Sequence, residues 1–141
     1  MVRPEIVRRK LRHLHLYLQE LERHRGVTIS GYRSSPGPRR EIERLIQLLV
    51  EVAVDINTHL VTESAGVPPK DYRESFKSVA QAGVITHELA EKLMPSAGLR
   101  NALVHDYADV DDKRVHAAIP LALDGFGAYA NEVLSWLEPR P

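Results

Sequence analysis

The segment from residue 39 to 62 has the composition of a helix that is apolar on almost every side. Its exceptions are Gln47, Glu51, Asp55 and His59, whose four-residue spacing places them along one narrow line of the helix surface. Such a helix must be covered on most sides, either at the centre of a bundle or against another subunit. The segment therefore favours a helical protein built around this element, and both ways of covering it stay open.

Further helices are predicted on both sides of this segment. From about Pro4 to His24, apolar residues recur at three- and four-residue steps, which is typical of an amphipathic helix. Residues 25–38 are rich in Gly, Pro and Ser, so we expect a loop there. Asp71 followed by Glu74 has the pattern of a capping box, which predicts a short helix as far as about Gln81.

Two helices are predicted in the last third of the chain. The first begins near Thr86 and runs to about Tyr107, and Pro95 with Gly98 is expected to kink or divide it near Met94. Asp109 is the expected N-cap of a last helix over 110–137, with a kink or split at Pro120. The fold class predicted for residues 1–141 is thus one all-α domain, an up-and-down bundle of about five helices.

Composition excludes several classes of protein. Hydrophobic residues make up 43% and charged residues 27% of the 141 residues, which excludes a disordered or low-complexity chain. Cysteine is absent, so neither a disulfide framework nor thiolate chemistry is available. The N-terminus lacks the apolar core of a signal peptide, and no run of about 18 apolar residues occurs. We therefore expect a cytoplasmic protein.

The net charge is zero, but the charges are unevenly distributed. Residues 1–44 carry 11 basic and 5 acidic side chains, and the excess is reversed in the rest of the chain. This asymmetry points to an anionic partner for the N-terminal region, or to a solvated basic helix face, or to attraction between the two halves.

Polar and reactive side chains are concentrated between residues 98 and 107. On a helical wheel that starts at Arg100, Asn101 falls at about 100°, His105 at about 140° and Tyr107 at about −20°. The guanidinium suits phosphate oxygens, and the imidazole titrates near neutral pH. By spacing alone these residues fit either a satisfied polar cluster or an active site.

The same segment resembles a known signature. Arg100-x4-His105-x-Tyr107 is similar to the R-x4-H-x-Y motif of the HEPN superfamily, whose members are helical bundles and frequently ribonucleases. Three longer stretches resemble HepT-like toxins of that superfamily, in the same order along the chain: Glu43-Arg44-Leu45-Ile46-Gln47 with Asp55-Ile56, Asp71-Tyr72-Arg73-Glu74-Ser75-Phe76 with Ala82-Gly83-Val84-Ile85, and Leu99-Arg100-Asn101-x-Leu103-Val104-His105-x-Tyr107.

The resemblance implies a metal-independent endoribonuclease, the toxin of a toxin–antitoxin pair, that needs no cofactor. It implies that His105 acts as the general acid or base and that Arg100 holds the phosphate of the RNA substrate. Asn101 would orient either group, and Tyr107 would bind the phosphate or the RNA. In this family a partner, a minimal nucleotidyltransferase antitoxin of the MntA type, adds AMP to the tyrosine. The family's active site forms where two protomers meet, which implies a homodimer and allows a higher assembly with the antitoxin.

Other interpretations stay open at this point. Tyr107 would serve equally as a core or interface aromatic, and a non-catalytic helical dimer that binds and regulates a nucleotidyltransferase would share this fold. Asp55 and Glu51 belong either to a solvent-facing stripe or to the surroundings of Arg100 and His105, and Asp55 is the preferred candidate because it matches the family pattern. The histidines have no partners at ligand spacing, so no metal site is expected.

Overall fold

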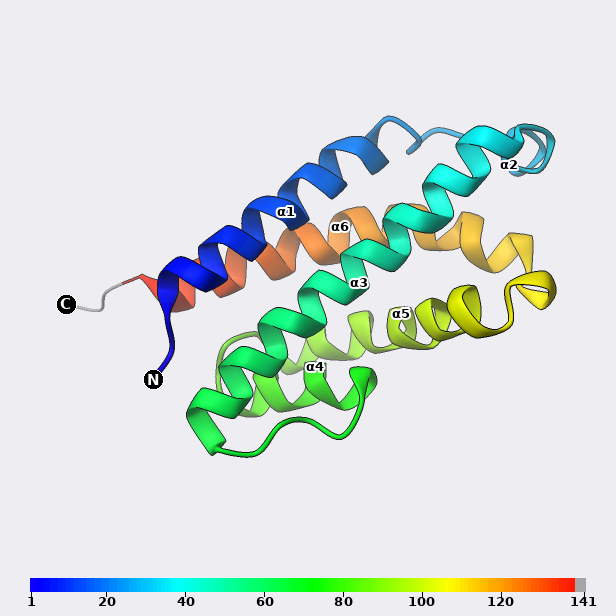
Figure 1. The fold of residues 1–141 in the computed structure, drawn as a ribbon. Coiled ribbons are helices and arrows are strands. Elements are labelled where there is room, and N and C mark those ends of the chain that lie inside the picture. The colour runs from blue at the N-terminus through cyan, green and yellow to red at the C-terminus, as the bar shows by residue number, and fades with distance from the viewer. Residues whose placement is uncertain (139–141) are drawn as a thin grey trace.

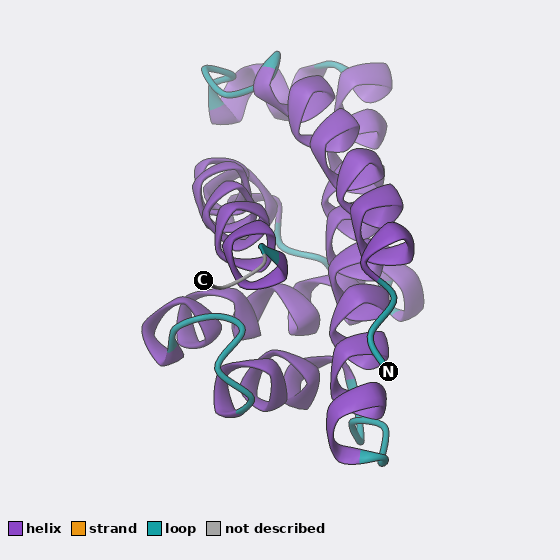
Figure 2. Cartoon of the chain, turned by 90° about the vertical axis from the view of Figure 1, so that its left-hand side faces the viewer, coloured by secondary structure: helices purple, strands orange, loops and turns teal. Residues whose placement is uncertain are grey.

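The computed structural model describes residues 1–138 as a bundle of helices (Figure 1). The described residues form six α-helices and one short 3₁₀ helix. No strand is drawn among them in Figure 2. In chain order the elements are α1 (Pro4–Glu22), α2 (Ile29–Ser34), α3 (Pro36–Ala65), α4 (Tyr72–Gln81), α5 (His87–His105), η1 (Tyr107–Asp109) and α6 (Asp112–Leu137). The predicted all-α bundle is therefore confirmed.

Helix α3 is the central element of the bundle. It packs against each of the other five α-helices, and thirteen of its residues are buried within the chain. It is also long and apolar enough to cross a membrane, but 61% of its most apolar window is buried inside the protein. Val50 and Val54, in the middle of this helix, are only 0% and 6% exposed. The bundle itself thus covers α3, and this helix gives no evidence for a dimer.

A buried polar cluster joins α4 and α6 to α3. Asn57 on α3 donates a hydrogen bond from Nδ2 to Oγ of Ser75 on α4, at 3.1 Å, and its Oδ1 accepts one from the hydroxyl of Tyr129 on α6. The Tyr129 hydroxyl also lies 3.1 Å from the carbonyl oxygen of Ala53. All these side chains are fully buried, so each needs a partner, and the cluster fixes the register of α4 and α6 against α3.

The predicted loop at 25–38 is wrong in part, because it contains a short helix. Thr28 caps α2 by accepting a hydrogen bond from the backbone nitrogen of Gly31 at 3.0 Å, and α2 buries Tyr32. Helix α3 then begins at Pro36, earlier than predicted, since proline is well suited to the first turn of a helix. It ends at Ala65 and is capped by Gly66, whose φ of 75° is the left-handed conformation that glycine adopts without strain.

The two internal prolines do not divide their helices. Pro95 lies within the continuous α5 and Pro120 within the continuous α6. Both prolines are exposed, so water can reach the backbone around the hydrogen bond that each one removes. The C-terminal end of α5 is also shorter than predicted, because the α-helix stops at His105 and Tyr107 opens η1.

Capping residues set the starts of the remaining helices. Asp71 accepts a hydrogen bond from the backbone nitrogen of Glu74 at 2.7 Å, which confirms the predicted start of α4. Helix α6 begins after Asp111, whose side chain accepts from the Lys113 nitrogen at 2.9 Å, so the prediction of Asp109 as its cap is wrong.

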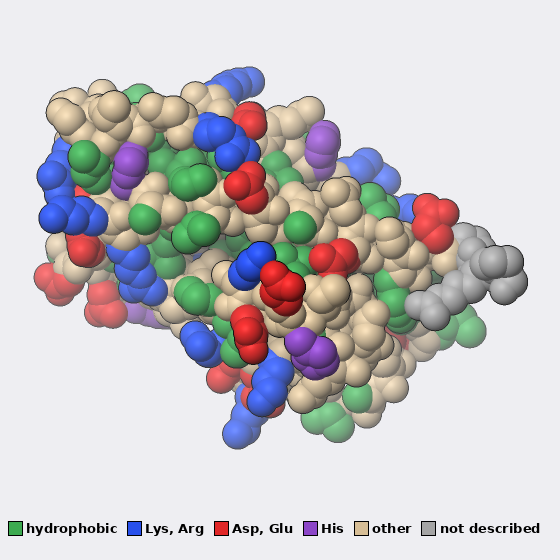
Figure 3. Space-filling view, turned by 180° about the vertical axis from the view of Figure 1, so that it is seen from behind, with side chains coloured by type: hydrophobic (Ala, Val, Ile, Leu, Met, Phe, Trp, Pro, Cys, Tyr) green, Lys and Arg blue, Asp and Glu red, His purple; other side chains and the backbone are tan. Residues whose placement is uncertain are grey.

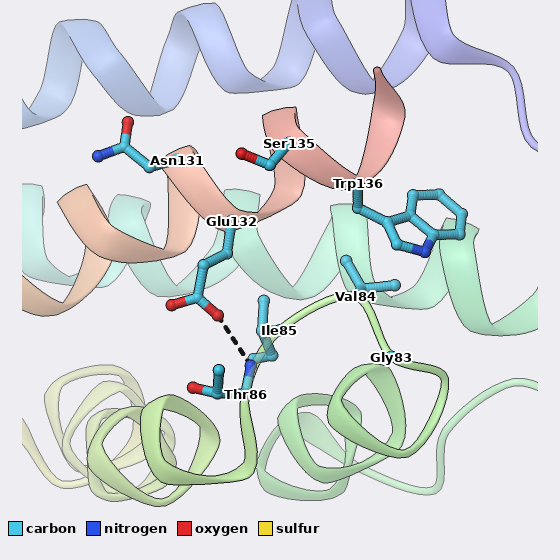
Figure 4. Close-up of a pocket in the computed structure, with 8 residues that line it drawn as sticks. All are labelled: Gly83, Val84, Ile85, Thr86, Asn131, Glu132, Ser135 and Trp136. Carbon is cyan, nitrogen blue, oxygen red and sulfur yellow. Dashed lines mark hydrogen bonds between the residues drawn. The ribbon is translucent and has the colours of Figure 1, made fainter. Parts of the chain in front are cut away.

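A hollow of about 390 Å³ lies beside the start of α5, where α6 passes it (Figure 4). Glu132 of α6 reaches across it and accepts a hydrogen bond from the backbone nitrogen of Thr86 at 2.8 Å. This bond satisfies one of the unpaired amides at the N-terminus of α5. The hollow thus serves a structural contact between α5 and α6, and it contains none of the predicted site residues.

Candidate active site

The signature residues lie where the C-terminal end of α5 packs against the first half of α3. In Figure 1 the yellow end of α5, with η1, is at the same end of the bundle as the cyan start of α3. Packing between α3 and α5 brings the polar line of α3 under the signature, so the two stretches form one site although they are distant in sequence.

Arg100 is held mainly by Glu51 of α3. Its Nε and Nη2 atoms donate to the same carboxylate oxygen of Glu51, at 3.0 Å and 2.8 Å. Its Nη1 donates to Oδ1 of Asn101 at 3.2 Å, and its guanidinium lies over the ring of Tyr72, 4.5 Å from the centroid. The Arg100 side chain is only 17% exposed. The guanidinium is therefore held in one position within the chain, and the orienting role of Asn101 stays a prediction.

Gln47 extends this arrangement along α3. Its Nε2 donates to Glu51 at 3.0 Å, and it lies one helical turn from both Glu51 and Glu43. Glu43, Gln47 and Glu51 thus form a line on α3 that runs beneath α5 and η1.

Tyr107 occupies the opposite end of that line. Its hydroxyl donates to Oε1 of Glu43 at 2.6 Å, while the side chain remains 51% exposed. The other oxygen of Glu43 accepts from the hydroxyl of Tyr32 at 2.6 Å and from Nε of Arg39 at 3.4 Å. Glu43 is 6% exposed, so its buried charge is balanced by these three donors.

The carboxylate of Glu43 alters the acidity of both phenols. Its hydrogen bond to Tyr107, helped by partial burial, raises the pKa of that phenol, and the charges of Arg39 and Arg40 oppose the rise. Burial raises the pKa of Tyr32 still more, and its hydrogen bond to Glu43 adds to the shift. Both hydroxyls therefore stay protonated and act as donors at neutral pH.

The predicted proximity of Tyr107 to Arg100 on one line of a helix is wrong. Because α5 ends at His105, the helical wheel does not extend to Tyr107. Instead Tyr107 bonds to Glu43 and Arg100 to Glu51, and these two carboxylates are about 12 Å apart along α3 by the rise of a helix. The phenol therefore marks a second position on the same surface.

His105 is the last residue of α5 and is exposed. Among residues 1–138 its ring has no hydrogen-bond partner, so the imidazole is accessible to a substrate. By helix geometry its side chain leaves α5 at about 140° from that of Arg100. The predicted positions of Arg100 and His105 on one helix thus agree with the structure, whereas their chemical roles stay predictions.

Asp55, the preferred candidate for supporting Arg100 or His105, is not their partner. Its carboxylate is 65% exposed and lies 3.7 Å from Nζ of Lys10 on α1. Glu51, one turn earlier, takes that place beside Arg100. Glu43 was missed altogether as a site residue, although it belongs to one of the stretches that match the family. It lies four residues before Gln47 and eight before Glu51, and this spacing was the available signal.

A hollow of about 190 Å³ lies beside Tyr107. It is lined by Arg40, Glu43, Arg44, Gln47, Leu103 and Tyr107. Figure 3 shows the face opposite to that of Figure 1, where acidic and basic side chains gather at the left edge, which is the η1 end of the bundle. Within the described part of the chain, no three His, Asp or Glu side chains cluster closely enough to hold a metal ion.

Comparison with known proteins agrees with this fold and these motifs. The bundle superposes on a HEPN toxin of Shewanella oneidensis, which was solved tri-AMPylated and in complex with an MNT antitoxin. The TM-score is 0.82 at 22% identity, covering 92% of this chain and 97% of that one. The fold is therefore that of HEPN toxins.

Sequence comparison shows the family directly. Residues 14–133 match the model of the family described as "Ribonuclease HepT-like". A tRNA nuclease HepT from Aphanizomenon flos-aquae is 33% identical over 136 residues, 96% of this chain and 92% of that protein. An mRNA nuclease HepT from Shewanella oneidensis is 35% identical over 66 residues, 47% of this chain and 50% of that protein. The chain belongs to the HepT-like ribonuclease family.

Proposed function

We propose that this protein is a metal-independent endoribonuclease that acts as the toxin of a toxin–antitoxin pair. The observation that carries the proposal is the fixed guanidinium of Arg100 on the same helical end as the free imidazole of His105. The nuclease names of its relatives support an RNA substrate, and the antitoxin complex of its structural neighbour supports the toxin role.

In the proposed reaction, the 2′-hydroxyl of a ribose attacks the adjacent phosphorus while the bond to the 5′-oxygen of the next nucleotide breaks. His105 takes the proton of the attacking hydroxyl as general base or gives one to the leaving oxygen as general acid. Arg100 donates to the phosphate oxygens, on which negative charge increases in the transition state. The products are a 2′,3′-cyclic phosphate and a free 5′-hydroxyl, and the protons balance through His105 and water.

Control of this activity is proposed to act through Tyr107. A nucleotidyltransferase partner of the MntA type would direct the phenol oxygen to the α-phosphorus of ATP, with release of pyrophosphate. The 2.6 Å hydrogen bond places Glu43 where its carboxylate can take the phenol proton as the new bond forms. The adduct adds bulk and negative charge beside the site, which would oppose the binding of RNA.

Cleavage in the presence of EDTA tests the catalytic proposal. Purified protein should cut RNA with a chelator present and leave cyclic phosphate ends. His105→Ala should lower the rate by about 10²–10⁴-fold, the usual contribution of a positioned acid or base. Equal cleavage by wild type and variant would contradict the role of His105, and loss of wild-type activity on chelation would contradict metal independence. Inactivity of both proteins, with tight binding to a nucleotidyltransferase, would favour a regulatory subunit instead.

Intact mass measurement tests the control proposal. Incubation with the partner nucleotidyltransferase, ATP and Mg²⁺ should add one or more AMP units at Tyr107, and ribonuclease activity should fall in parallel. An adduct on Tyr72 or Tyr129, or no adduct, would contradict Tyr107 as the modified residue.

A further inference from the structure

Two exposed arginines, Arg40 and Arg44, line the hollow beside Tyr107. They are four residues apart on α3, so their side chains leave the same face of the helix one turn apart. Within residues 1–138 neither arginine has an ion pair or a side-chain hydrogen bond. Both guanidinium groups are thus free to bind a ligand.

Nearby arginines differ in this respect. Arg39 pairs with Asp112 at 2.6 Å and with Glu43 at 3.4 Å, and Arg100 pairs with Glu51. Two unpaired like charges one turn apart repel each other, which is unfavourable until an anion lies between them. The hollow therefore holds an uncompensated positive charge at a defined place.

The rest of the lining also suits an anion. Nε2 of Gln47 uses one of its two N–H donors for Glu51 and can direct the second to a ligand. The phenol of Tyr107 stands at the edge of the hollow. Glu43 is the one acidic side chain in the lining, and its two carboxylate oxygens already accept from Tyr107, Tyr32 and Arg39. The charge of Glu43 is thus directed to these partners. Arg40 and Arg44 therefore make the electrostatic potential in the hollow positive.

We propose that Arg40 and Arg44, with the amide of Gln47, form a phosphodiester-binding subsite next to Tyr107. The subsite is separate from the phosphate position at Arg100, because the partners of the two sites on α3 are about 12 Å apart along the helix. It binds a phosphate of the RNA backbone away from the bond that is cut and, in the modified protein, the phosphodiester that joins AMP to Tyr107. This inference rests on the proposed function, and it explains how an adduct distant from Arg100 excludes RNA.

RNA binding at several salt concentrations tests the subsite. The probe is a short fluorescein-labelled 2′-O-methyl oligouridine, which cannot be cleaved by attack of its own 2′-oxygen. For single strands the slope of log K against log salt is about −0.7 per phosphate contact. Because the two arginines share one phosphate in this subsite, Arg40→Gln combined with Arg44→Gln should make the slope shallower by about 0.7. The Arg40→Lys and Arg44→Lys double variant keeps both charges and should keep the wild-type slope.

A matched control comes from α1. Arg8 and Arg12 are also exposed, also four residues apart and also without an ion pair among the described residues, but α1 does not pack against α5 or η1. Arg8→Gln with Arg12→Gln removes the same charge and should leave the slope unchanged. Equal slopes for wild type and Arg40→Gln with Arg44→Gln would overturn the proposal. So would an equal decrease of the slope in the Gln double variants of α3 and α1.

The phosphodiester of RNA and that of the AMP adduct on Tyr107 are distinguished by the NMR signals of Arg40 and Arg44. In proton–nitrogen correlation spectra, the Nε signals of Arg40 and Arg44 are assigned from their absence in the single Gln variants. Attachment of AMP to Tyr107 should shift both signals and abolish their further shift by the oligouridine. Shifts with the oligouridine alone would restrict the subsite to RNA, and absence of shifts with either ligand would overturn it.

The proposed function fails in a different way from this inference. If His105→Ala abolishes cleavage while the α3 double variant binds RNA with the wild-type slope, the ribonuclease assignment stands and the subsite is wrong. If the wild-type protein neither cleaves nor binds the oligouridine, the proposed function itself is wrong.

Discussion

At the scale of single residues, two nitrogens of Arg100 donate to one carboxylate oxygen of Glu51. This contact fixes the direction of the guanidinium, and it leaves part of Nη1 and Nη2 for a phosphate. Fixing a catalytic group before the substrate arrives lowers the cost of reaching the transition state. Glu51 is therefore expected to act as a positioning residue.

Loss of Glu51 should reduce turnover more than binding. Glu51→Ala is expected to lower kcat for RNA cleavage on the order of 100-fold, the effect of misplacing a reacting group, with a much smaller change in KM. Asp55→Ala is the control, because Asp55 is exposed and pairs with Lys10 instead. Steady-state kinetics with a fluorogenic RNA checks this. Equal kcat values for both variants would contradict a positioning role.

Because Tyr32 is buried, the free energy of unfolding of the protein is expected to vary with pH in the alkaline range. Burial and Glu43 hold the pKa of its phenol above the ordinary value of the unfolded chain, about 10. A group whose pKa is raised by folding stabilises the protein fully below its unfolded pKa, and this contribution is lost as the pH rises through the folded pKa. The free energy of unfolding should therefore fall above about pH 10, and less steeply in Tyr32→Phe. Urea unfolding of both proteins between about pH 9 and 11 measures this difference. Parallel plots of the free energy of unfolding against pH for wild type and Tyr32→Phe would contradict it.

The candidate site could be predicted from sequence only where it is local. Arg100, Asn101 and His105 lie within one helix, so their spacing defined their arrangement. The partners on α3 depend on how α3 and α5 slide against each other, and a shift of one turn exchanges Glu51 for Asp55. That register is set by packing of buried side chains from several helices, which periodicity does not reveal.

At the scale of helices, the sequence patterns predicted five of the six α-helices of the described residues, and the capping box at Asp71 predicted the start of α4. They failed for α2, because six residues that include Gly31 and two serines have little periodicity, and burial of Tyr32 supplies the stability that the local sequence lacks. The prediction that Pro95 and Pro120 would kink or divide their helices is wrong as to division, since both helices are continuous. An exposed proline removes one hydrogen bond without ending a helix that is packed along its length.

The cap of α6 can be tested by comparing two aspartates. Asp111→Ala should lower the free energy of unfolding by about 1 kcal/mol, because it removes the acceptor for the Lys113 nitrogen. Asp109→Ala removes the same type of side chain from the exposed η1 segment and should change stability by less than about 0.5 kcal/mol. Urea denaturation of both variants measures the difference, and equal losses would show that Asp111 is not the effective cap.

At the scale of the whole molecule, the bundle covers α3 internally, so a homodimer must use another surface. Val104 lies on the last turn of α5, between Arg100 and His105, and is 39% exposed. An apolar side chain at this place would be covered if two chains met around the ends of α5, and that contact would also exclude water from both sites. We therefore expect a homodimer that joins through the region of the candidate site.

Two valines distinguish the interface from the core. The protein should sediment at twice the 15.9 kDa mass of one chain. Val104→Asp should shift it to the monomer with unchanged helix content, because a charge would be buried between the chains. Val54→Asp should instead unfold the protein, since Val54 is 6% exposed within a single chain and an unpaired charge there costs several kcal/mol. A wild-type monomer, or a Val104→Asp variant that stays dimeric, would contradict an interface at the end of α5.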